Sequence, residues 1–344
     1  MTMYFFKKTQ NIIFLSLIIV FFTTSCSDSN SSNQSILFTS GGRTSEILVV
    51  INNDLWNSAI GDSIKASFQI TPPWSARIEP EYIISHIPIK AFGSTYQKQR
   101  NILFIKKVVD GKEKVEIRRN VYAKPQSLIV IKANDIESLT KSFVKYQNKI
   151  KSVFHKNELK RISNAYRGLE EKKLGAQLGQ KFGFKVVLPK GFEMASNKAD
   201  FAWLRRVTKD VEEGIIIYTI PYNDTASFNM QNIINLRNSL TKFYIPGPIN
   251  DTYMKVSNIF PPYSTQTDFK GHYSMELRSL WDVKGYAMGG PFMSYTFVDS
   301  LASRLITIDG YIKAPKKEKR DLMLHVEAIL NSFEYVELKK DTVK

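Results

Sequence analysis

The stretch Ile136–Val153, IESLTKSFVKYQNKIKSV, decides the fold class because it separates two groups of predicted strands. Its apolar residues recur at alternating spacings of three and four, which is the period of one face of an α-helix. The pattern resumes after residue 158, so the segment is either one bent helix or a helical hairpin. The apolar positions are Ile136, Leu139, Phe143, Tyr146, Ile150, Val153, Leu159, Ile162, Tyr166, Leu169, Leu174 and Leu178. We therefore predict a helical connector over residues 134–181.

This connector is strongly basic. The chain holds 48 basic and 32 acidic residues, and residues 88–181 alone hold 22 basic and 8 acidic ones. Five lysines lie opposite the apolar stripe and form a candidate basic surface: Lys141, Lys145, Lys149, Lys156 and Lys160. Such a surface suits an anionic membrane, an anionic polymer or an acidic protein partner. The alternative is a solvated helix face without a partner. The aromatic-interleaved patterns of nucleic-acid-binding modules are absent from the sequence, so we expect no nucleic acid partner.

Upstream of the connector, residues 42–133 are predicted to form a first α+β unit in the order β-α-β-β-β. Ser45–Ile51, SEILVVI, is an apolar run of strand length. Asn52, Asn53 and Asp54 then offer caps for an amphipathic helix with Leu55, Trp56, Ala59, Ile60 and Ile64 on one side. Further strands are predicted at Ile83–Ile89, Ile102–Val109, Val115–Arg118 and Ser127–Lys132, with Asp110-Gly111 as a hairpin turn.

Downstream of the connector, residues 182–337 are predicted to form a second α+β unit, followed by a tail over 338–344. A helix is predicted at Phe228–Phe243, and a last helix opens at Pro315. Gly289-Gly290-Pro291 is predicted as a tight turn before a strand. The predicted strands are Lys185–Leu188, Phe201–Arg206, Gly214–Pro221, Tyr273–Trp281, Met293–Val298, Leu305–Ile312 and Phe333–Val336.

These strands lack the regular alternation with helices that a doubly wound parallel sheet needs. The sequence therefore predicts an α+β protein with mostly antiparallel sheets and packed helices, built as two units joined by the helical segment. The order of elements over residues 182–337 resembles the PsbP/Mog1-type fold, and this resemblance rests on the pattern alone.

The first residues follow the order of a secretory signal. Lys7 and Lys8 precede the apolar run NIIFLSLIIVFF, residues 11–22, and then come small residues and Cys26. A run of about 12 residues is short for a membrane-spanning helix, which needs about 20. We therefore predict a lipoprotein signal peptide over residues 1–25, with lipid on Cys26. Thr23 departs from the pattern, since many lipoproteins have Leu there.

Cys26 is the single cysteine of the chain, so no intramolecular disulfide is expected. The polar stretch SDSNSSNQS follows it and cannot bury a core, so residues 26–41 are predicted to be a flexible tether. These features predict an exported protein held at the cell envelope. We expect it at the outer membrane, on the periplasmic or the surface face. Two acyl chains would suffice for stable anchoring.

Several phrases together resemble a family of Bacteroidota lipoproteins whose domain has no known function. They are GRTSEILVV (residues 42–50), DLW (54–56), RNI (100–102), NVYAKPQ (120–126), FAWLRR (201–206) and GGPF (289–292). The resemblance spans about residues 40–337 and implies an envelope lipoprotein. It supplies no activity, cofactor or site residue.

No catalytic motif is assembled in the sequence. The four histidines, His86, His155, His272 and His325, stand singly and form no metal-binding pair, so each is interpreted as structural or exposed. A GxSxG elbow, an SxxK motif and a phosphate-cradling glycine loop are also missing. We therefore predict no metal site and no cofactor, while a metal site built from distant side chains stays open.

The most site-like residues are arginines interleaved with aromatic and acidic residues in the second unit. Arginine beside Trp and Tyr suits the recognition of carboxylate, phosphate or sugar. The alternative is a set of ion pairs at the edge of the core. The candidate ligand-binding residues are Trp203, Arg205, Arg206, Tyr222, Arg237, Arg278, Trp281 and Asp282, with Asp224 beside Tyr222.

Three functions follow from these observations. The leading hypothesis is a non-catalytic, lipid-anchored protein that binds an envelope protein or an anionic envelope polymer. The second is an enzyme acting on an envelope glycan or lipid, which requires Arg205, Arg237, Arg278 and Asp282 to converge in one cleft. The third is a periplasmic carrier of an apolar ligand, which requires an apolar cavity between sheet and helices.

Overall fold

The computed structural model describes residues 37–336, except for residues 73–74, 76 and 110. Residues from Phe38 onward group into one compact unit. The expected signal peptide, Cys26 and the expected tail lie outside the described residues. Within the described part of the chain, no helix is both long and apolar enough to cross a membrane.

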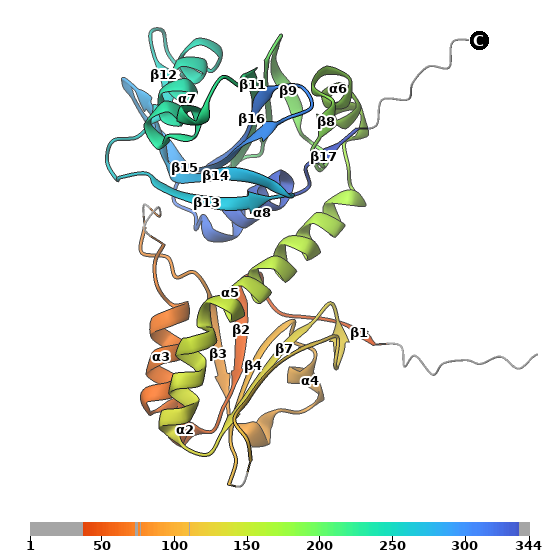
Figure 1. The fold of residues 1–344 in the computed structure, drawn as a ribbon, viewed down its shortest axis with the longest axis vertical. Helices are drawn as coiled ribbons and strands as arrows, with labels where there is room; N and C mark the ends of the chain where they lie inside the picture. Colours follow the sequence, from red (N-terminus) through yellow and green to blue (C-terminus); the bar gives the residue numbers. More distant parts are fainter. Residues whose placement is uncertain (1–36, 73–74, 76, 110, 337–344) are drawn as a thin grey trace, which may run out of the picture. The chain divides into compact units, whose positions relative to one another are not determined.

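The first sheet has five strands in the order β3-β2-β4-β7-β5 (Figure 1). The neighbours β3–β2, β2–β4 and β4–β7 are parallel, and β5 runs antiparallel to β7. β2 and β7 are apolar along most of their length and lie inside the sheet, because such strands can bury both faces. The strands are β2 (Glu46–Val50), β3 (Ile83–Ile87), β4 (Asn101–Lys107), β5 (Lys114–Arg119) and β7 (Ser127–Ala133).

The hairpin predicted at Asp110-Gly111 is wrong. β4 and β5 follow one another in the chain, but β7 lies between them in the sheet and pairs with both. The physical reason is burial, since β7 is buried along most of its length whereas β5, KVEIRR, is largely exposed. The polar strand therefore takes the edge, and the apolar strand takes the interior.

Helices cover both faces of the first sheet. α3 (Ala59–Phe68) and α5 (Ile136–Arg167) pack side by side on one face, and the short α4 (Ser94–Gln97) lies on the other (Figure 1). α5 is a single helix of 32 residues. Its N-cap Asp135 accepts a hydrogen bond from the Ser138 backbone N–H. The short α2 (Asn53–Trp56) and the 3₁₀ turn η1 (Ile89–Ala91) complete this part.

The chain enters this part through a short parallel pair. β1 (Phe38–Thr39) pairs with β6 (Ala123–Lys124). Gly41 forms an isolated bridge with Gln99. The fold therefore includes residues 38–41, which the sequence predicts as part of the tether.

The predicted connector consists of two separate helices. α5 stops at Arg167, and α6 (Lys172–Phe182) follows after four residues. α6 ends at Gly183, whose φ of 76° is left-handed and favours glycine. The next strand, β8 (Phe184–Lys185), pairs with β17 (Glu334–Tyr335) near the end of the described chain.

The second sheet is antiparallel throughout. Its strand order is β12-β14-β15-β16-β11-β10-β9, and β13 pairs with β14 beside this path. Strands that follow one another in the chain usually pair in this sheet. This arrangement is expected from strands that do not alternate with helices. The strands are β9 (Glu193–Lys198), β10 (Phe201–Val207), β11 (Glu212–Pro221), β12 (Tyr253–Val256), β13 (Tyr263–Phe269), β14 (His272–Lys284), β15 (Tyr286–Asp299) and β16 (Arg304–Lys313).

Each face of the second sheet has its own apolar cluster. One cluster packs α6 and α8 (Arg320–Leu330) against residues such as Leu204, Met293 and Ile306. The other packs α7 (Met230–Tyr244) against residues such as Ile216, Phe292 and Tyr311. The 3₁₀ turn η2 (Thr225–Phe228) leads into α7. Side chains on opposite faces of this sheet therefore belong to different environments.

Three details of the second part differ from expectation. The strands β9, β12 and β13 escape prediction, because they are short or largely polar. Gly289-Gly290 lies inside β15 rather than in a turn. A Cβ at Gly290 would lie 1.9 Å from the Ile312 carbonyl oxygen, so only glycine permits the close backbone approach there. The last helix begins at Arg320, five residues after Pro315.

The whole is an α+β protein with mostly antiparallel strand pairs, as the sequence predicts. The parallel pairs of named strands are confined to the first sheet and to the short β1–β6 pair within the described residues.

Candidate ligand-binding pocket

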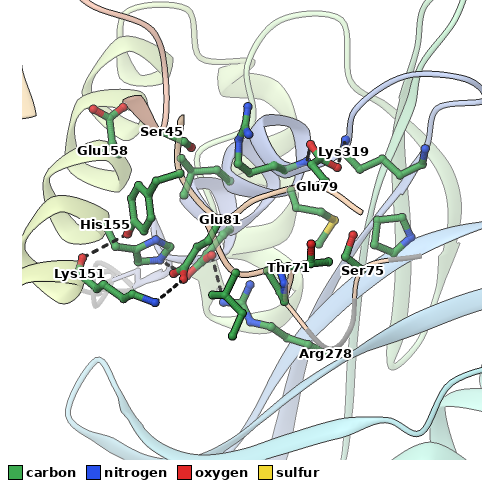
Figure 2. Close-up of a pocket in the computed structure, with 18 of the residues that line it drawn as sticks. Ser45, Thr71, Ser75, Glu79, Glu81, Lys151, His155, Glu158, Arg278 and Lys319 are labelled. Carbon is green, nitrogen blue, oxygen red and sulfur yellow. Dashed lines mark hydrogen bonds and ion pairs between the residues drawn. The ribbon is translucent and has the colours of Figure 1, made fainter. Parts of the chain in front are cut away.

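A pocket of about 500 Å³ lies between α5, α8 and the segment that follows α3 (Figure 2). Volumes of about 300–1,000 Å³ are usual for small-molecule sites. Its apolar wall includes Ile70, Pro291, Met323 and Leu324. The remaining lining residues are mostly polar or charged, so the pocket combines apolar and charged side chains.

On the α5 side, Lys151, Ser152, His155 and Glu158 line the pocket. Residues three and four positions apart, such as Lys151, His155 and Glu158, lie along one stripe of a helix. The stripe lies beside the apolar residues that hold α5 on the first sheet. The single helix therefore contributes both to the core and to the pocket wall.

A charged cluster at the pocket is built around the carboxylate of Glu327 on α8. His155 Nε2 lies 2.7 Å from Glu327 Oε1, and Arg278 Nη2 lies 3.0 Å from Glu327 Oε2. Arg278, on β14, also forms an ion pair with Glu276. The Glu327 side chain is only 5 % exposed, so its two cationic partners offset the cost of burying its charge.

These contacts shift the pKa values of the group. Burial raises the pKa of Glu327, but Arg278 and His155 outweigh it and lower that pKa to about 2. Burial lowers the pKa of His155, but the Glu327 carboxylate outweighs it, and the net shift is upward from 6.5. The Arg278 guanidinium stays charged, because its two carboxylates outweigh burial and raise its pKa. The pair therefore exists as imidazolium and carboxylate over a wider pH range than isolated groups would.

A second ion pair stands at the pocket wall nearby. Lys151 Nζ lies 2.8 Å from Glu81 Oε2, and the Tyr82 hydroxyl donates to the Lys151 backbone carbonyl (Figure 2). Tyr82 is buried, and burial raises its pKa well above 10, so its hydroxyl remains neutral. These contacts fix α5 against the segment that leads into β3.

Glu79 has a structural role at the same wall. Its carboxylate accepts hydrogen bonds from the backbone N–H groups of Lys319 and Arg320, at 2.9 and 2.8 Å. Backbone donors at a helix start have no partner within the helix, and the helix dipole favours negative charge there. A residue from the first part of the chain thus caps a helix about 240 positions later in the sequence.

Acidic and basic side chains line the pocket in nearly equal number. Glu79, Glu81, Glu158 and Glu327 face the basic residues Lys151, Arg278, Lys319 and Arg320, with His155 as a further partner. Such a lining does not select a ligand of high charge of either sign. It suits an amphipathic ligand with little net charge.

The candidate residues of β10 are occupied by separate partners. Trp203 donates its indole N–H to the Tyr311 hydroxyl at 3.0 Å. Arg205 pairs with Glu193 at 3.0 Å, and Arg206 pairs with Glu213. These contacts match the alternative interpretation of ion pairs at the edge of the core.

The candidates near α7 are also engaged. Arg237 is buried and forms a bidentate pair with Asp309, at 2.8 and 3.4 Å. Trp281 donates its indole N–H to the Ile312 carbonyl. Asp282 pairs with Lys255 at 2.9 Å, and Tyr222 packs its ring near Phe228.

The four residues proposed to meet in a catalytic cleft do not converge. Arg237 packs over Phe292, on the face of the second sheet that α7 covers. Arg278 reaches Glu327 of α8, on the opposite face. Of the eight candidate residues, Arg278 is the one that lines the pocket.

The candidate basic surface lies on α5 as expected. Its five members, Lys141, Lys145, Lys149, Lys156 and Lys160, belong to this one helix, and we call them the helix-face lysines. All five are exposed. Lys141 pairs with Glu137 one turn earlier. Within the described residues, no group of three or more His, Cys, Asp or Glu side chains is placed to hold a metal ion.

Sequence reasoning misses the pocket because its charged residues come from distant segments. The sequence marks His155 as structural or exposed and does not single out Glu327. One signal is available, since Glu327 stands among the apolar residues of α8 and interrupts a buried face. A carboxylate in such a position needs a partner.

The matches to known protein families divide the chain at the end of α5. Residues 40–167 match a domain of unknown function (DUF8532), and residues 171–332 match a second domain of unknown function (DUF4837). The two matches together span most of the described chain, and neither description names an activity. No curated protein matches the sequence.

Solved structures give a weak likeness. The Saccharomyces cerevisiae Ran-binding protein Mog1p is 12 % identical, over 45 % of this chain and 90 % of that one, with a TM-score of 0.29. A point mutant of the protein Mog1 gives 13 % identity over 45 % and 91 %, with the same TM-score. A TM-score of 0.29 is too low to carry an argument about fold or activity.

Proposed function

We propose that this chain is a lipid-anchored, non-catalytic binding protein of the cell envelope, exported by its N-terminal signal and held at the outer membrane through Cys26. Its folded body binds a small amphipathic ligand of low net charge in the pocket between α5 and α8. The observation that supports this proposal is the pocket of about 500 Å³, whose lining combines apolar residues with charged residues of both signs.

Binding is better supported than catalysis. An enzyme that used the arginine, aspartate and aromatic residues would need them in one cleft, and their contacts hold them apart. The polar groups at the pocket wall are bonded to one another, as in the His155–Glu327–Arg278 cluster. Such preformed groups orient a ligand at little cost in side-chain entropy.

A carrier of a purely apolar ligand is less well supported. Its cavity would be lined by apolar side chains throughout, because buried charges are costly beside a ligand that cannot pair with them. The pocket instead presents four carboxylates and four basic side chains. An amphipathic ligand can contact both the apolar and the charged side chains of this lining.

The proposal is tested with the neutral fluorescent probe N-phenyl-1-naphthylamine. The wild-type protein should bind it saturably at one site. Ile70 lines the pocket and is 53 % exposed, so Ile70→Asp removes apolar contact and adds charge. Its expected effect is a loss of affinity of about tenfold, because about 1.4 kcal/mol corresponds to one decade.

The matched control is Ile249→Asp, because Ile249 is 56 % exposed and lies outside the pocket. It should bind the probe as the wild type does. Equal losses in both variants, or no saturable binding by the wild type, would reject the pocket as the ligand site. The anchor is tested separately, since Cys26→Ser should move the protein from the membrane fraction to the soluble fraction.

A further inference from the structure

A row of lysines crosses the first sheet on the face opposite α5. Lys106 of β4 lies directly opposite Lys132 of β7, and Lys132 lies directly opposite Lys114 of β5. Directly paired residues of neighbouring strands share a face of the sheet. We call Lys106, Lys114 and Lys132 the sheet-face lysines. Like charges in such positions destabilise a sheet, so the row has a cost that folding alone does not explain.

Little negative charge compensates this row. Glu116 pairs with Lys114 and Arg118, which also lie on this strand. Within the described part of the chain, Lys106 and Lys132 have no side-chain hydrogen bond or ion pair. Lysines often protect an exposed edge strand from aggregation, but that role fits only Lys114. β4 and β7 are interior strands of the sheet.

Partly buried aromatic residues adjoin the row on the same face. Phe104 precedes Lys106 by two positions, so both side chains point to one side of β4. The ring of Phe92 lies 5.7 Å from Phe104 and 5.8 Å from Tyr122. These rings pack on the apolar cluster of this face. Basic side chains beside aromatic rings are typical of surfaces that meet a membrane interface.

The structure divides the positive charge of residues 88–181 between two opposite sides. Phe143 and Ile150 of α5 pack on the other face of the first sheet, and the helix-face lysines extend from the same helix. A planar anionic surface can therefore meet the sheet-face lysines or the helix-face lysines, but not both at once. The aromatic neighbours distinguish the sheet face.

We infer that the sheet-face lysines, with Phe92, Phe104 and Tyr122, dock the folded body on anionic lipid headgroups. This inference rests on the anchor of the proposed function and adds a membrane-binding face to it. Cys26 is twelve residues from Phe38, a span of at most roughly 40 Å even when fully extended. A lipid on Cys26 would thus keep the body close enough for the sheet face to reach the bilayer.

The test uses the chain from residue 26 onward with Cys26→Ser, so that binding does not depend on lipidation. Sedimentation is measured with vesicles of phosphatidylglycerol and phosphatidylcholine, and with vesicles of phosphatidylcholine alone. The parent protein should bind only the anionic vesicles, and salt should weaken this binding. Replacing the three sheet-face lysines by Gln should lower the partition coefficient on the order of 100-fold.

The matched control replaces Lys141, Lys145 and Lys149 by Gln, which removes the same number of charges from α5. It should change binding by less than about threefold. The inference fails if the control loses binding as much as the sheet-face variant, or if the parent ignores anionic vesicles. A failure of lipidation at Cys26 would leave these results unchanged and would reject only the anchor.

Thermal unfolding shows whether the variant without the sheet-face lysines is still folded. Removing like charges that face one another should leave the midpoint equal or raise it. A lower midpoint would show that the row stabilises the sheet and would contradict its assignment as a docking surface.

Discussion

The buried pair of Arg237 and Asp309 shows how one residue can look functional in a sequence and be structural in the fold. Arg237 is 1 % exposed, its guanidinium lies 3.9 Å from the Phe292 ring centre, and Asp309 supplies its counter-charge. Arginine near aromatic residues fits ligand recognition equally well. A ligand-binding arginine and a structural one differ in solvent access, and here α7 covers the Arg237–Asp309 pair.

This pair should respond sharply to the loss of one partner. Asp309→Asn leaves a buried guanidinium without its carboxylate and should lower the free energy of unfolding by about 3–5 kcal/mol. The double variant Arg237→Met with Asp309→Leu should recover most of that loss, since it removes both charges. Urea unfolding measures both values.

The exposed pair Arg205–Glu193 provides the control. Its side chains are 39 % and 63 % exposed, so Glu193→Gln should cost no more than about 1 kcal/mol. If Asp309→Asn costs as little as Glu193→Gln, the interpretation of a desolvated, charged pair is wrong.

His155 and Glu327 make stability depend on pH. The folded-state pKa of His155 is raised above 6.5, so its contribution is complete below pH 6.5 and is lost as pH rises through the folded-state value. The pKa of Glu327 is lowered from 4.5 to about 2, so its contribution is complete above pH 4.5 and is lost as pH falls toward 2. Both contributions are present together between pH 4.5 and 6.5.

The difference in unfolding free energy between the wild type and His155→Gln should therefore be largest in that window and shrink on either side. Chemical denaturation across pH measures it. His325→Gln is the contrast, because burial lowers the pKa of His325 and should give the opposite slope near pH 6.5. A difference for His155→Gln that is flat across pH would exclude the charged pair.

At the scale of elements, α8 depends on a cap from outside its own sequence. Lys319 stands at its N-cap position and provides no side-chain cap. Glu79 supplies the acceptors instead, from the segment before β3. The capped backbone N–H groups lie where the helix begins, at Lys319 and Arg320.

Glu79→Ala should lower the free energy of unfolding by about 2 kcal/mol, because two backbone donors lose a charged acceptor. Glu79→Gln should cost less, since it keeps one oxygen acceptor. Equilibrium unfolding gives both values. The control is Glu318→Ala at a carboxylate beside the same helix start, which is 78 % exposed and should change stability by at most about 0.5 kcal/mol. Equal costs at the two positions would show that Glu79 does not cap α8.

The sequence predicts an element correctly where the spacing of its apolar residues matches a surface that the fold buries. The apolar stripe of α5 and the runs that form β2, β7, β11 and β16 predict their elements, since each buries a continuous surface. Strands such as β9 and β13 escape, because their polar residues gain strand structure only from neighbours already in place. The position of β7 between β4 and β5 also escapes, since strand order depends on contacts that local pattern does not encode.

The sequence predicts which chemical types of residue form the site, but not which residues meet there. Arginine and carboxylate partners are expected from the sequence, and Arg278 lines the pocket. Most of the proposed set instead pairs locally, as Arg206 does with Glu213 across adjacent strands. The residues that do meet, His155 and Glu327, are 172 positions apart. They belong to two helices, and the apolar stripe of either helix alone does not predict that the two pack together.

At the scale of the whole molecule, α5 belongs to both halves of the fold. Leu139, Phe143, Ile150 and Phe154 pack on the first sheet, whereas Ile162 packs against Leu324 and Ala328 of α8. The match to the first domain of unknown function ends at residue 167, with this helix. The sequence boundary between the two domains therefore follows the helix end, and the packing crosses it.

The length of α5 has a practical consequence for dissection of the protein. A chain cut between residues 167 and 171 leaves each fragment with half of a shared interface, so Leu324 and Ala328 lose their cover in the second fragment. Each fragment alone would be prone to self-association. Produced together, the two pieces carry complementary surfaces and ion pairs, which makes this protein a natural candidate for a split reporter that reassembles without a covalent link.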